Sequence, residues 1–376
     1  MKITFINDGI YTYAQDLANA VGGAERQQWL LARALVTKGW AVTVGVRNLL
    51  TAGERRTING VDFVGIGQGQ FFLAFYRFLV SERPHWVYWR GADHLLGPCT
   101  AIARSLGIRT VFSLAFDTEV QPRSALFRRQ RWWRLYAWGL SLSDVIFVQH
   151  GQQLAGLKPS LQTKALILRS MVHQVANTKP HSEREPSIVW AAVLRQPKRP
   201  DVLIHIARQA PTVRFIVCGG TTAYQCPPGY GERIVAELQA TPNIEYLGQV
   251  APNKSLQVIA NASLLLSTSD EEGFPNTFLE AWTSGTPVVS VKIDPDHIIQ
   301  RRQLGTVSYS VEQTLFDIKA LLNAPQRRDD IAARARSYIE ASHSERVIVN
   351  AFEQALEQAG DYMKQSSVRG LRDTIA

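Results

Sequence analysis

The stretch from Leu264 to Val289 constrains the fold of this chain more than any other part of it, and it reads LLLSTSDEEGFPNTFLEAWTSGTPVV. The apolar start at 264–266 predicts a buried parallel strand. Pro275 stands where a helix can begin, because its fixed φ suits the first turn and its missing N–H is not needed there. Gly285 predicts the end of that helix, and 286–290 predicts the next strand. The result is a βαβ unit whose loop lies at the carboxyl end of a sheet, where open α/β folds bind ligands.

Two carboxylates flank this loop, Glu272 within it and Glu280 on the helix. Carboxylates accept hydrogen bonds from sugar hydroxyls, and the free N–H groups at a helix N-terminus bind phosphate. Those N–H groups belong to Gly273, Phe274, Asn276 and Thr277. The loop therefore suits a ligand that carries both hydroxyls and phosphates. The alternative is a solvated acidic turn followed by an ordinary helix, because a pair of glutamates is a weak motif by itself.

The run Glu272-Gly-Phe-Pro-Asn-Thr-Phe-Leu-Glu280 closely resembles the E-x7-E motif of the family 4 glycosyltransferases, and the order of segments resembles that family over nearly the whole chain. The resemblance implies an α/β chain of the GT-B fold, with two Rossmann-like parallel-sheet domains facing a central cleft. It also implies that Glu280 binds the nucleotide ribose and that Glu272 faces the donor sugar. The loop between them, Pro275 included, would contact the sugar or its diphosphate.

The domain boundaries follow from composition and from the repeated α/β alternation. A polar, proline-containing run predicts a linker over 176–187 between a first domain of residues 1–175 and a second domain of residues 188–349. The chain ends with an amphipathic helix. Its part at about 350–366 is expected to cross back and pack on the first domain, as GT-B chains commonly do.

Several glycines stand where a backbone can approach a phosphate. Gly22 and Gly23 enter a predicted helix, a pattern that is weak by itself and gains weight from the matching loop of family 4 enzymes. In that family the turn matching Gly248 and Val250 touches the nucleobase through its backbone. Gly219, at the end of a predicted strand, is assigned to the same donor site.

Asp117 ends another predicted strand and therefore faces the expected cleft. Many family members carry a His in this region that contacts the donor sugar, but here the matching residues are 112–119 and include no His. Asp117 either takes that role or caps a helix.

The sequence departs from the family pattern where the second domain begins. Family members place an Arg and a Lys there to neutralise the leaving diphosphate; Lys198 matches, but Val193 replaces the Arg. Arg195 would point to the same side of an extended strand as Val193, about 6–7 Å further along, and Arg199 is another candidate. The departure raises the question of catalytic competence. The candidate catalytic residues are Glu272, Lys198, Arg195 and Asp117.

Residues 123–140 interleave arginines with aromatics, and a helix is predicted over them. Arg128, Arg131 and Arg134 would lie on the outer face with Trp138, an arrangement that suits an anionic membrane surface. The alternative is that the aromatics pack in the core and the arginines are merely solvated.

Composition and the first residues limit which partners and which cellular compartment we expect for this chain. Net charge is +9 with a pI of about 9.6, which favours an acidic partner, although no nucleic-acid motif is present. Residues 1–8 predict the first strand of a mature domain and no secretory signal. Three cysteines form no metal-ligand pattern and fit a reducing cytoplasm. We therefore expect a cytoplasmic protein, with the inner face of the membrane as a possible site of peripheral binding.

The function implied by the resemblance is that of a retaining glycosyltransferase that needs no metal or other cofactor. It would move a sugar from a nucleotide-sugar donor to a glycan or lipid-linked acceptor, in cell-surface polysaccharide or glycolipid synthesis. Two alternatives remain open at this point: a non-catalytic nucleotide-sugar-binding protein and a nucleotide-sugar epimerase with the same fold.

Overall fold

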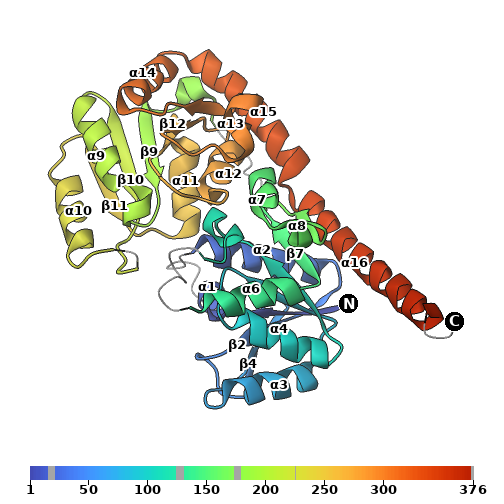
Figure 1. Ribbon diagram of the computed structural model, residues 1–376. Coiled ribbons are helices and arrows are strands. Elements are labelled where there is room, and N and C mark those ends of the chain that lie inside the picture. Colours follow the sequence, from blue (N-terminus) through green and yellow to red (C-terminus); the bar gives the residue numbers. More distant parts are fainter. Residues whose placement is uncertain (16–21, 124–130, 173–178, 225, 374–376) are drawn as a thin grey trace. The chain divides into compact units, whose positions relative to one another are not determined.

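A computed structural model of the chain describes residues 1–15, 22–123, 131–172, 179–224 and 226–373 (Figure 1). The described residues form two compact units. The first contains Met1–Gln15, Gly22–Met171 and the chain from Glu345 onward; the second contains Val172–Ser344. The second unit thus begins at residue 172, well before the predicted 188, and ends at residue 344, a few residues before the predicted 349.

The described part of the predicted linker belongs to the second unit. His181 and Arg184 are 2% and 6% exposed. The Arg184 guanidinium donates to the carbonyl oxygens of Ala262 (3.1 Å) and Ser284 (3.0 Å), and His181 Nε2 lies 2.8 Å from the Gly285 oxygen. The polar composition predicts an exposed linker. In the structure these polar side chains are buried, because they form hydrogen bonds with the carbonyl groups at the ends of helices. Residues 173–178 lie outside the described part of the chain.

The first unit is built on an eight-stranded sheet in the order β3-β4-β2-β1-β5-β6-β7-β8. Neighbouring strands are parallel except β3 and β4, which are antiparallel. Its strands are β1 Lys2–Ile6, β2 Ala41–Val46, β3 Arg55–Ile58, β4 Val61–Gly65, β5 Trp86–Arg90, β6 Arg109–Ser113, β7 Val145–Val148 and β8 Ala165–Ile167. Its helices are α1 Asp8–Gln15, α2 Gly23–Thr37, α3 Phe71–Glu82, α4 Leu96–Ser105, the 3-10 turn η1 Asp117–Val120, α6 Trp133–Leu142, α7 Gly151–Gly156, α8 Pro159–Gln162 and α16 Glu345–Asp373.

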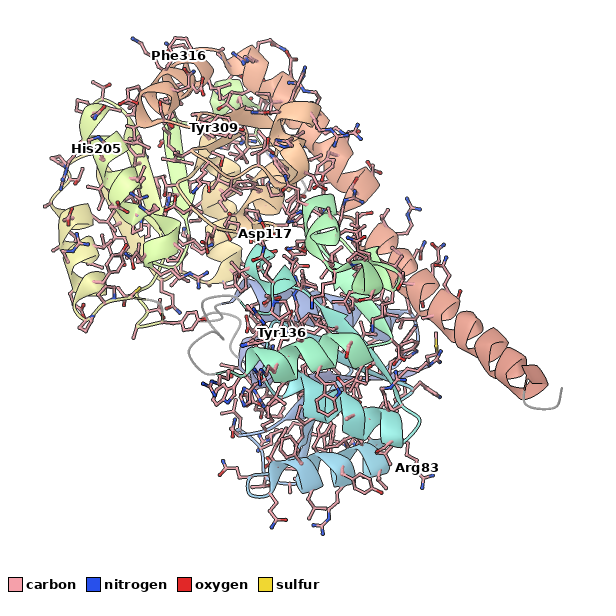
Figure 2. All side chains as sticks on the ribbon, viewed as in Figure 1. Arg83, Asp117, Tyr136, His205, Tyr309 and Phe316 are labelled. Atoms are coloured by element: carbon pink, nitrogen blue, oxygen red, sulfur yellow. The ribbon has the colours of Figure 1, made fainter. Side chains whose placement is uncertain are left out.

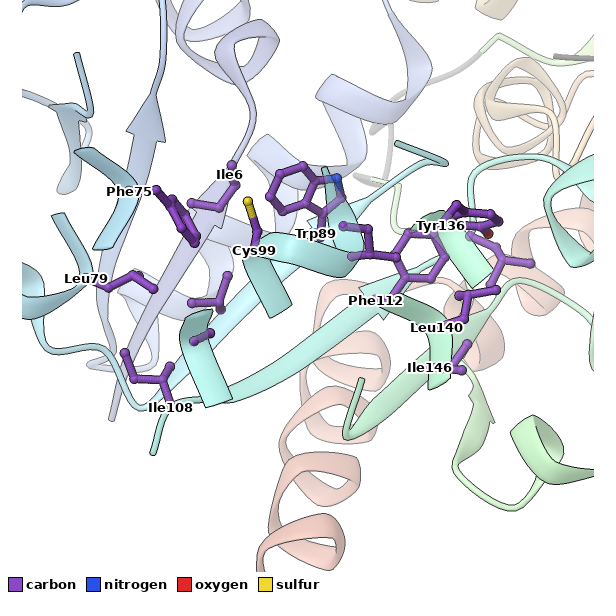
Figure 3. Packing of buried hydrophobic residues seen from close by; sticks show 14 of the residues in the cluster. Ile6, Phe75, Leu79, Trp89, Cys99, Ile108, Phe112, Tyr136, Leu140 and Ile146 are labelled. Atoms are coloured by element: carbon purple, nitrogen blue, oxygen red, sulfur yellow. The ribbon is translucent and has the colours of Figure 1, made fainter. Parts of the chain in front are cut away.

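Helices cover both faces of this sheet. On one face α3, α4 and α6 lie side by side and share a core that includes Phe75, Cys99 and Tyr136 (Figure 3). The last helix, α16, belongs to this unit and packs on α2 and β7. Its Phe352 is fully buried, with ring centroids 5.4 Å from Phe147 and 6.3 Å from Tyr88.

The second unit is built on a six-stranded parallel sheet in the order β11-β10-β9-β12-β13-β14. Its strands are β9 Ser187–Ala191, β10 Arg214–Cys218, β11 Ile244–Gly248, β12 Leu264–Ser267, β13 Val288–Ser290 and β14 Gly305–Val307. Its helices and 3-10 turns are η2 His181–Glu183, η3 Gln196–Lys198, α9 Pro200–Gln209, α10 Tyr230–Gln239, α11 Pro252–Asn261, α12 Asn276–Thr283, η4 Pro295–His297, α13 Ile298–Arg302, α14 Val311–Leu322 and α15 Pro325–Ser342.

The side chains of β9 show why a central strand of this sheet is apolar along almost its whole length. Ile188 and Trp190 pack into one core cluster, whereas Val189 and Ala191 pack into another. Successive strand residues point to opposite faces, so a strand with helices on both sides is apolar at every position. Each unit is therefore a Rossmann-like α/β domain, as the sequence predicts. Within the described residues, no helix is both long enough and apolar enough to span a bilayer.

Candidate functional site

The loop singled out by the sequence lies where it was predicted, between β12 and α12. Pro275 is the N-cap of α12, and Gly285 follows the helix with a φ of +70°. The helix is anchored because Phe278 and Trp282 are fully buried in the core of the second unit. The loop is thereby held at the carboxyl end of β12.

Glu272 and Lys198 form an ion pair in this loop region. The Ser269 hydroxyl donates a hydrogen bond of 3.0 Å to the same Glu272 oxygen. Both charged side chains are only 12% exposed. Burial lowers the pKa of Lys198, Glu272 opposes that change, and Arg195 adds to it. The structure thus brings three of the predicted catalytic residues together.

The pair is held in place by hydrogen bonds between two loops. The strands β9 and β12 are parallel neighbours, so the loops that follow them meet at one edge of the sheet. The Thr268 hydroxyl donates to the Lys198 carbonyl (2.7 Å) and accepts from the Trp190 indole (2.9 Å). The Asp270 amide donates to the Pro197 carbonyl at 2.9 Å. Lys198 and Glu272 are therefore positioned by backbone that is itself fixed.

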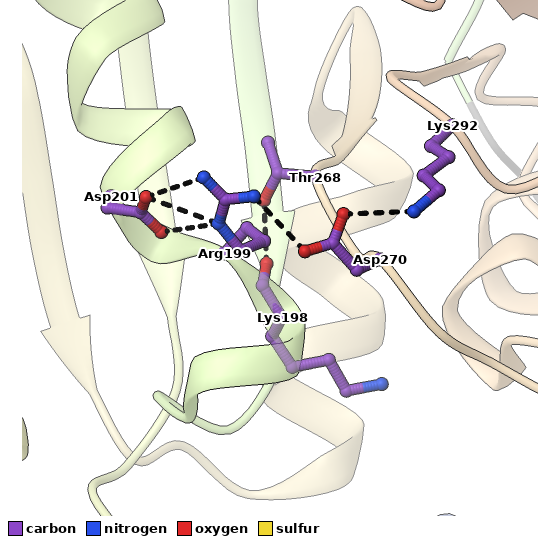
Figure 4. Close-up of polar contacts among 6 residues, drawn as sticks. All are labelled: Lys198, Arg199, Asp201, Thr268, Asp270 and Lys292. Carbon is purple, nitrogen blue, oxygen red and sulfur yellow. Dashed lines mark hydrogen bonds and ion pairs between the residues drawn. The ribbon is translucent and has the colours of Figure 1, made fainter. Parts of the chain in front are cut away.

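Arg199, the other candidate for the diphosphate, is already engaged (Figure 4). Its guanidinium donates to Asp201 at 2.9–3.2 Å and to Asp270 at 3.1 Å, and Lys292 lies 3.3 Å from the other Asp270 oxygen. These carboxylates hold the pKa of Arg199 above its usual value. The role of Arg199 in this structure is to link the two loops.

The predicted strand position of Arg195 is wrong. β9 ends at Ala191, and Arg195 precedes the 3-10 turn η3, so counting residues along an extended strand does not apply. The Arg195 amide instead donates to the Val193 carbonyl at 2.9 Å in a tight turn. The turn brings Arg195 close enough to affect the pKa of Lys198.

The remaining donor-site candidates of the second unit occupy neighbouring positions. Glu280 is in the middle of α12 and is 4% exposed. The Gly219 amide donates to the Gly248 carbonyl at 2.8 Å, and a Cβ atom at Gly219 would lie 1.8 Å from the Ala192 oxygen. Close backbone packing thus explains Gly219 without a ligand. Val250 is partly buried against the core.

The loop residues themselves show which parts face inward. The Phe274 side chain is 8% exposed and packs on Trp282 and His343, with ring centroids 6.2 and 5.3 Å away. Asn276 and Thr277 are half-buried in the first turn of α12. Only their backbone groups were expected to contact a ligand. Gly22 and Gly23 form the N-terminus of α2 in the first unit.

Asp117 is paired with a histidine that the sequence analysis missed. His150 Nε2 lies 2.8 Å from Asp117 Oδ1, and the Gln153 amide donates to the same oxygen at 2.8 Å. The Asp117 side chain is 51% exposed, whereas His150 is 3% exposed. Residues 112–119 contain no His, but the fold brings one to Asp117 from the segment that follows β7. One feature of the sequence could have indicated this contact. His150 comes two residues after the end of β7, and β7 lies beside β6 in the sheet.

Glu119 is a second buried acid that the sequence analysis did not single out. It is 6% exposed, and it accepts hydrogen bonds from the amides of Ala115 (2.7 Å) and Ala92 (3.0 Å). Burial raises the pKa of Glu119 to about 7, against the effect of those hydrogen bonds. It therefore joins the loops that follow β5 and β6.

The predicted helix over 123–140 begins later than expected. Arg131 has a φ of +56°, which breaks a helix, and α6 starts at Trp133. Tyr136 and Leu140 are buried as predicted, and Trp138 is 44% exposed. Arg134 is exposed on α6 with its guanidinium 5.5 Å from the Trp133 ring, while Arg128 lies outside the described residues.

One Asp-x-Asp pair occurs in the second unit, Asp294 and Asp296. The Asp294 carboxylate accepts from the amides of Ile299 (2.7 Å) and Gln300 (3.3 Å), so it caps the start of α13. Among the residues that the structure describes, no group of three or more His, Cys, Asp or Glu side chains could hold a metal ion.

Sequence comparison matches residues 185–324 to the family described as "Glycosyl transferases group 1". Over 113 residues, 30% of this chain, the sequence is 28% identical to the alpha-galactosylglucosyldiacylglycerol synthase of Streptococcus pneumoniae (strain ATCC BAA-255 / R6). That segment covers 30% of the relative, and the segments matched in the curated relatives span less than a third of their length.

Structure comparison extends over the whole chain. The sucrose-phosphate synthase of Thermosynechococcus elongatus superposes with a TM-score of 0.75 at 14% identity, covering 98% of this chain and 100% of that one. Anabaena Alr3699/HepE, solved with UDP and glucose, gives a TM-score of 0.73 at 14% identity, covering 95% and 100%. These similarities confirm the predicted fold class.

Proposed function

Because residues 185–324 belong to the group 1 glycosyltransferases and the chain has the GT-B fold, we propose that this protein is a glycosyltransferase. It moves a sugar from a nucleotide-sugar donor to a glycan or lipid-linked acceptor. We further propose that the reaction retains the anomeric configuration and requires no bound metal.

The observation that carries the proposal is the buried Lys198–Glu272 pair beside the N-terminus of α12. An ammonium group and free helix N–H groups stabilise charge on a departing diphosphate. Glu272 accepts hydrogen bonds from hydroxyls of the donor sugar. When the donor binds, Lys198 and Glu272 loosen their contact with each other, and each contacts the donor instead. Arg195 adds a second positive charge beside Lys198.

Calorimetric titration with UDP-, GDP-, ADP- and dTDP-sugars tests the donor site. UDP-glucose comes first, because Anabaena Alr3699/HepE has been solved with it. We expect one donor to bind, with at least tenfold weaker binding for Lys198→Ala and for Glu272→Gln. Glu271→Gln is the matched control, since Glu271 is an exposed acid of the same loop. A folded protein that binds none of these donors would contradict the proposal.

Metal independence is tested in the same assay. Transfer measured after treatment with excess EDTA should equal transfer before it, because Lys198, Arg195 and the α12 N-terminus supply the positive charge. Restoration of lost activity by Mg²⁺ or Mn²⁺ would show that a metal is required.

The acceptor class is proposed from charge and from the S. pneumoniae relative, whose name describes a diacylglycerol glycolipid synthase. A net charge of +9, with Arg131 and Arg134 exposed beside Trp138, suits an anionic membrane that carries the acceptor. Replacing both arginines by Glu should reduce transfer to a lipid acceptor in vesicles, and should leave donor binding unchanged.

One observation favours a second function, nucleotide-sugar binding without catalysis. Val193 stands where the family has an arginine, and in this structure it lies beyond the end of β9. Tight donor binding without product in an acceptor screen, and without slow donor hydrolysis, would favour that function over transfer.

A further inference from the structure

The outer face of α3 is apolar to an unusual degree for a surface helix. Its exposed large apolar side chains are Phe72 (45% exposed), Leu73 (43%), Tyr76 (43%) and Val80 (42%). They recur at helical spacing on the face opposite to Phe75 and Leu79, which are fully buried in the core. A contiguous exposed apolar patch of this kind marks a surface that binds something.

The exposed charged residues of α3 and its C-cap, Arg77 and Arg83, are both positive. The only acidic residue of α3 is Glu82, which is 5% exposed and paired with Lys2 (3.1 Å) and Arg55 (2.5 Å). Arg77 and Arg83 are exposed, and neither guanidinium has an ion pair or hydrogen bond with any residue that the structure describes (Arg83 is labelled in Figure 2).

The neighbouring helices share this character. The described helix α4 lies beside α3, and α6 lies beside α4; neither contains an Asp or Glu. The acids at their ends are paired with arginines: Asp144 lies 2.7 Å from Arg104, and Asp93 lies 3.7 Å from Arg47. By contrast, α16, which packs on α2 and β7 of the same unit, carries Glu345, Glu353 and Glu357. The basic and apolar character is therefore a property of the α3–α4–α6 layer.

We propose that the outer face of α3 binds the interface of an anionic lipid bilayer. Phe72, Leu73, Tyr76 and Val80 enter the boundary between headgroups and acyl chains, and Arg77 and Arg83 bind lipid phosphates. The absence of exposed carboxylates on these three described helices removes the repulsion that an anionic surface would otherwise exert. A protein partner of ordinary composition carries charges of both signs, so binding such a partner would not explain why the α3–α4–α6 layer carries exposed charges of only one sign.

This inference goes beyond sugar transfer, because it needs neither donor nor acceptor, and it names a surface separate from Arg131, Arg134 and Trp138. The α3 residues and the residues at or just before α6 belong to different segments, so their variants can be tested separately.

Sedimentation of the full chain with phosphatidylglycerol–phosphatidylcholine vesicles tests it. We expect Phe72→Ser with Tyr76→Ser to lower the partition coefficient at least about tenfold, because both aromatic side chains lose burial in the bilayer. Arg77→Gln and Arg83→Gln should each lower it roughly fivefold, and the wild-type chain should bind pure phosphatidylcholine vesicles far more weakly.

Phe316→Ser is the matched control, because Phe316 is an aromatic residue of a helix in the second unit and is 67% exposed (Figure 2). It should leave vesicle binding unchanged. Retained binding by the Phe72→Ser, Tyr76→Ser variant would overturn the inference. So would a wild-type chain that binds no vesicles and forms a dimer in sedimentation velocity that this double variant abolishes, since the face would then bind a second copy.

The outcomes separate this inference from the proposed function. Nucleotide-sugar calorimetry does not involve α3, so the double variant should bind donor as the wild type does. Donor binding without vesicle binding would overturn the α3 inference alone, and vesicle binding without donor binding would overturn the proposed function alone.

Discussion

At the scale of single residues, His150 is the side chain whose role is best defined by its contacts. Its Nε2 atom and the Gln153 amide both lie 2.8 Å from Asp117 Oδ1, so one oxygen of this half-exposed carboxylate is held in place. A carboxylate fixed in this way can accept a substrate hydroxyl without first losing rotational freedom. We propose that His150 positions Asp117 and that Asp117 contacts the substrate.

Replacement of His150 should therefore lower activity through Asp117. We expect His150→Ala to reduce kcat/KM for transfer by roughly tenfold to a hundredfold, as a misplaced contact group does. His150→Gln keeps an N–H donor and should restore part of the loss. Asp117→Asn should cost about as much with little effect on thermal stability, since Asp117 is half-exposed. His205→Ala, on the exposed side of α9, is the control and should change nothing.

Glu119 should make the stability of the first unit depend on pH. Burial raises its pKa from 4.5 to about 7 in the folded chain. Between those values the folded state holds a proton that the unfolded state has lost, so the free energy of unfolding falls as pH rises through this window. The effect of this one group is at most about 3 kcal/mol.

Denaturant titrations of wild type and Glu119→Gln at pH 5, 6 and 7 measure that dependence. The wild type should lose stability relative to the variant as pH rises, because the Gln side chain cannot ionise. Its one carbonyl oxygen can replace only one of the two Glu119 oxygens that accept from Ala92 and Ala115, and this loss is the same at every pH. Glu54→Gln, at a partly exposed acid of the same unit whose pKa is lowered and not raised, should follow the wild type. A constant difference between wild type and Glu119→Gln across the range would refute the buried-acid assignment.

At the scale of elements, the loops after β9, β10 and β11 pack closely on one another beside the donor-site candidates. A Cβ atom at Gly219 would lie 1.8 Å from the Ala192 carbonyl oxygen, so a side chain there would force the backbone of these loops to move. Gly220 differs, because its nearest neighbour is the flexible side chain of Gln249, at 2.7 Å.

Gly219→Ala should destabilise the second unit by about 2 kcal/mol or more, as overpacking of rigid backbone does. Gly220→Ala should cost clearly less, since the Gln249 side chain can rotate away. Thermal unfolding of both variants gives the comparison. Equal costs would mean that the backbone around Gly219 adapts more easily than its packing indicates.

The same loops show how far the sequence determines the site. The β12–α12 unit was predictable because each of its signals is local: an apolar strand, Pro275 at the helix start and Gly285 at its end. The family resemblance assigned Lys198 and Glu272 separately to the diphosphate and the donor sugar, and it did not predict that they pair with each other. The turn at Arg195 was not predictable, because nothing in the run 190–194 marks the end of β9 at Ala191. The residue at which a strand ends depends on its pairing with the neighbouring strands of the sheet.

Contacts between distant segments escaped prediction for a related reason. Asp117 and His150 are 33 residues apart and meet only because β6 and β7 are neighbours. Strand order is a property of the whole sheet, so the residues next to Asp117 in the sequence do not indicate which residue pairs with it. Likewise, the late start of α6 follows from the left-handed backbone at Arg131, a residue type that rarely adopts it.

At the scale of the whole molecule, the chain leaves the first unit at Met171 and returns to it at Glu345. The returning helix, α16, contributes Phe352 to the core of the first unit, and Glu353 accepts a 2.8 Å hydrogen bond from the Trp40 indole. The first unit is therefore completed only when the chain beyond the second unit has been made. Its stability depends on a segment far from its other strands in sequence.

Phe352→Ala tests whether the two units unfold separately. A fully buried Phe replaced by Ala costs about 3–5 kcal/mol, and here the loss falls on the first unit. Calorimetric scans should show the first unit's transition moving to lower temperature. The second transition should stay in place and rise when a bound nucleotide sugar is added, because Lys198 and Glu272 belong to the second unit. Phe316→Ala should shift neither transition by a comparable amount. If Phe352→Ala and the donor instead move one common transition, the two units unfold together, and binding at the second unit stabilises the first.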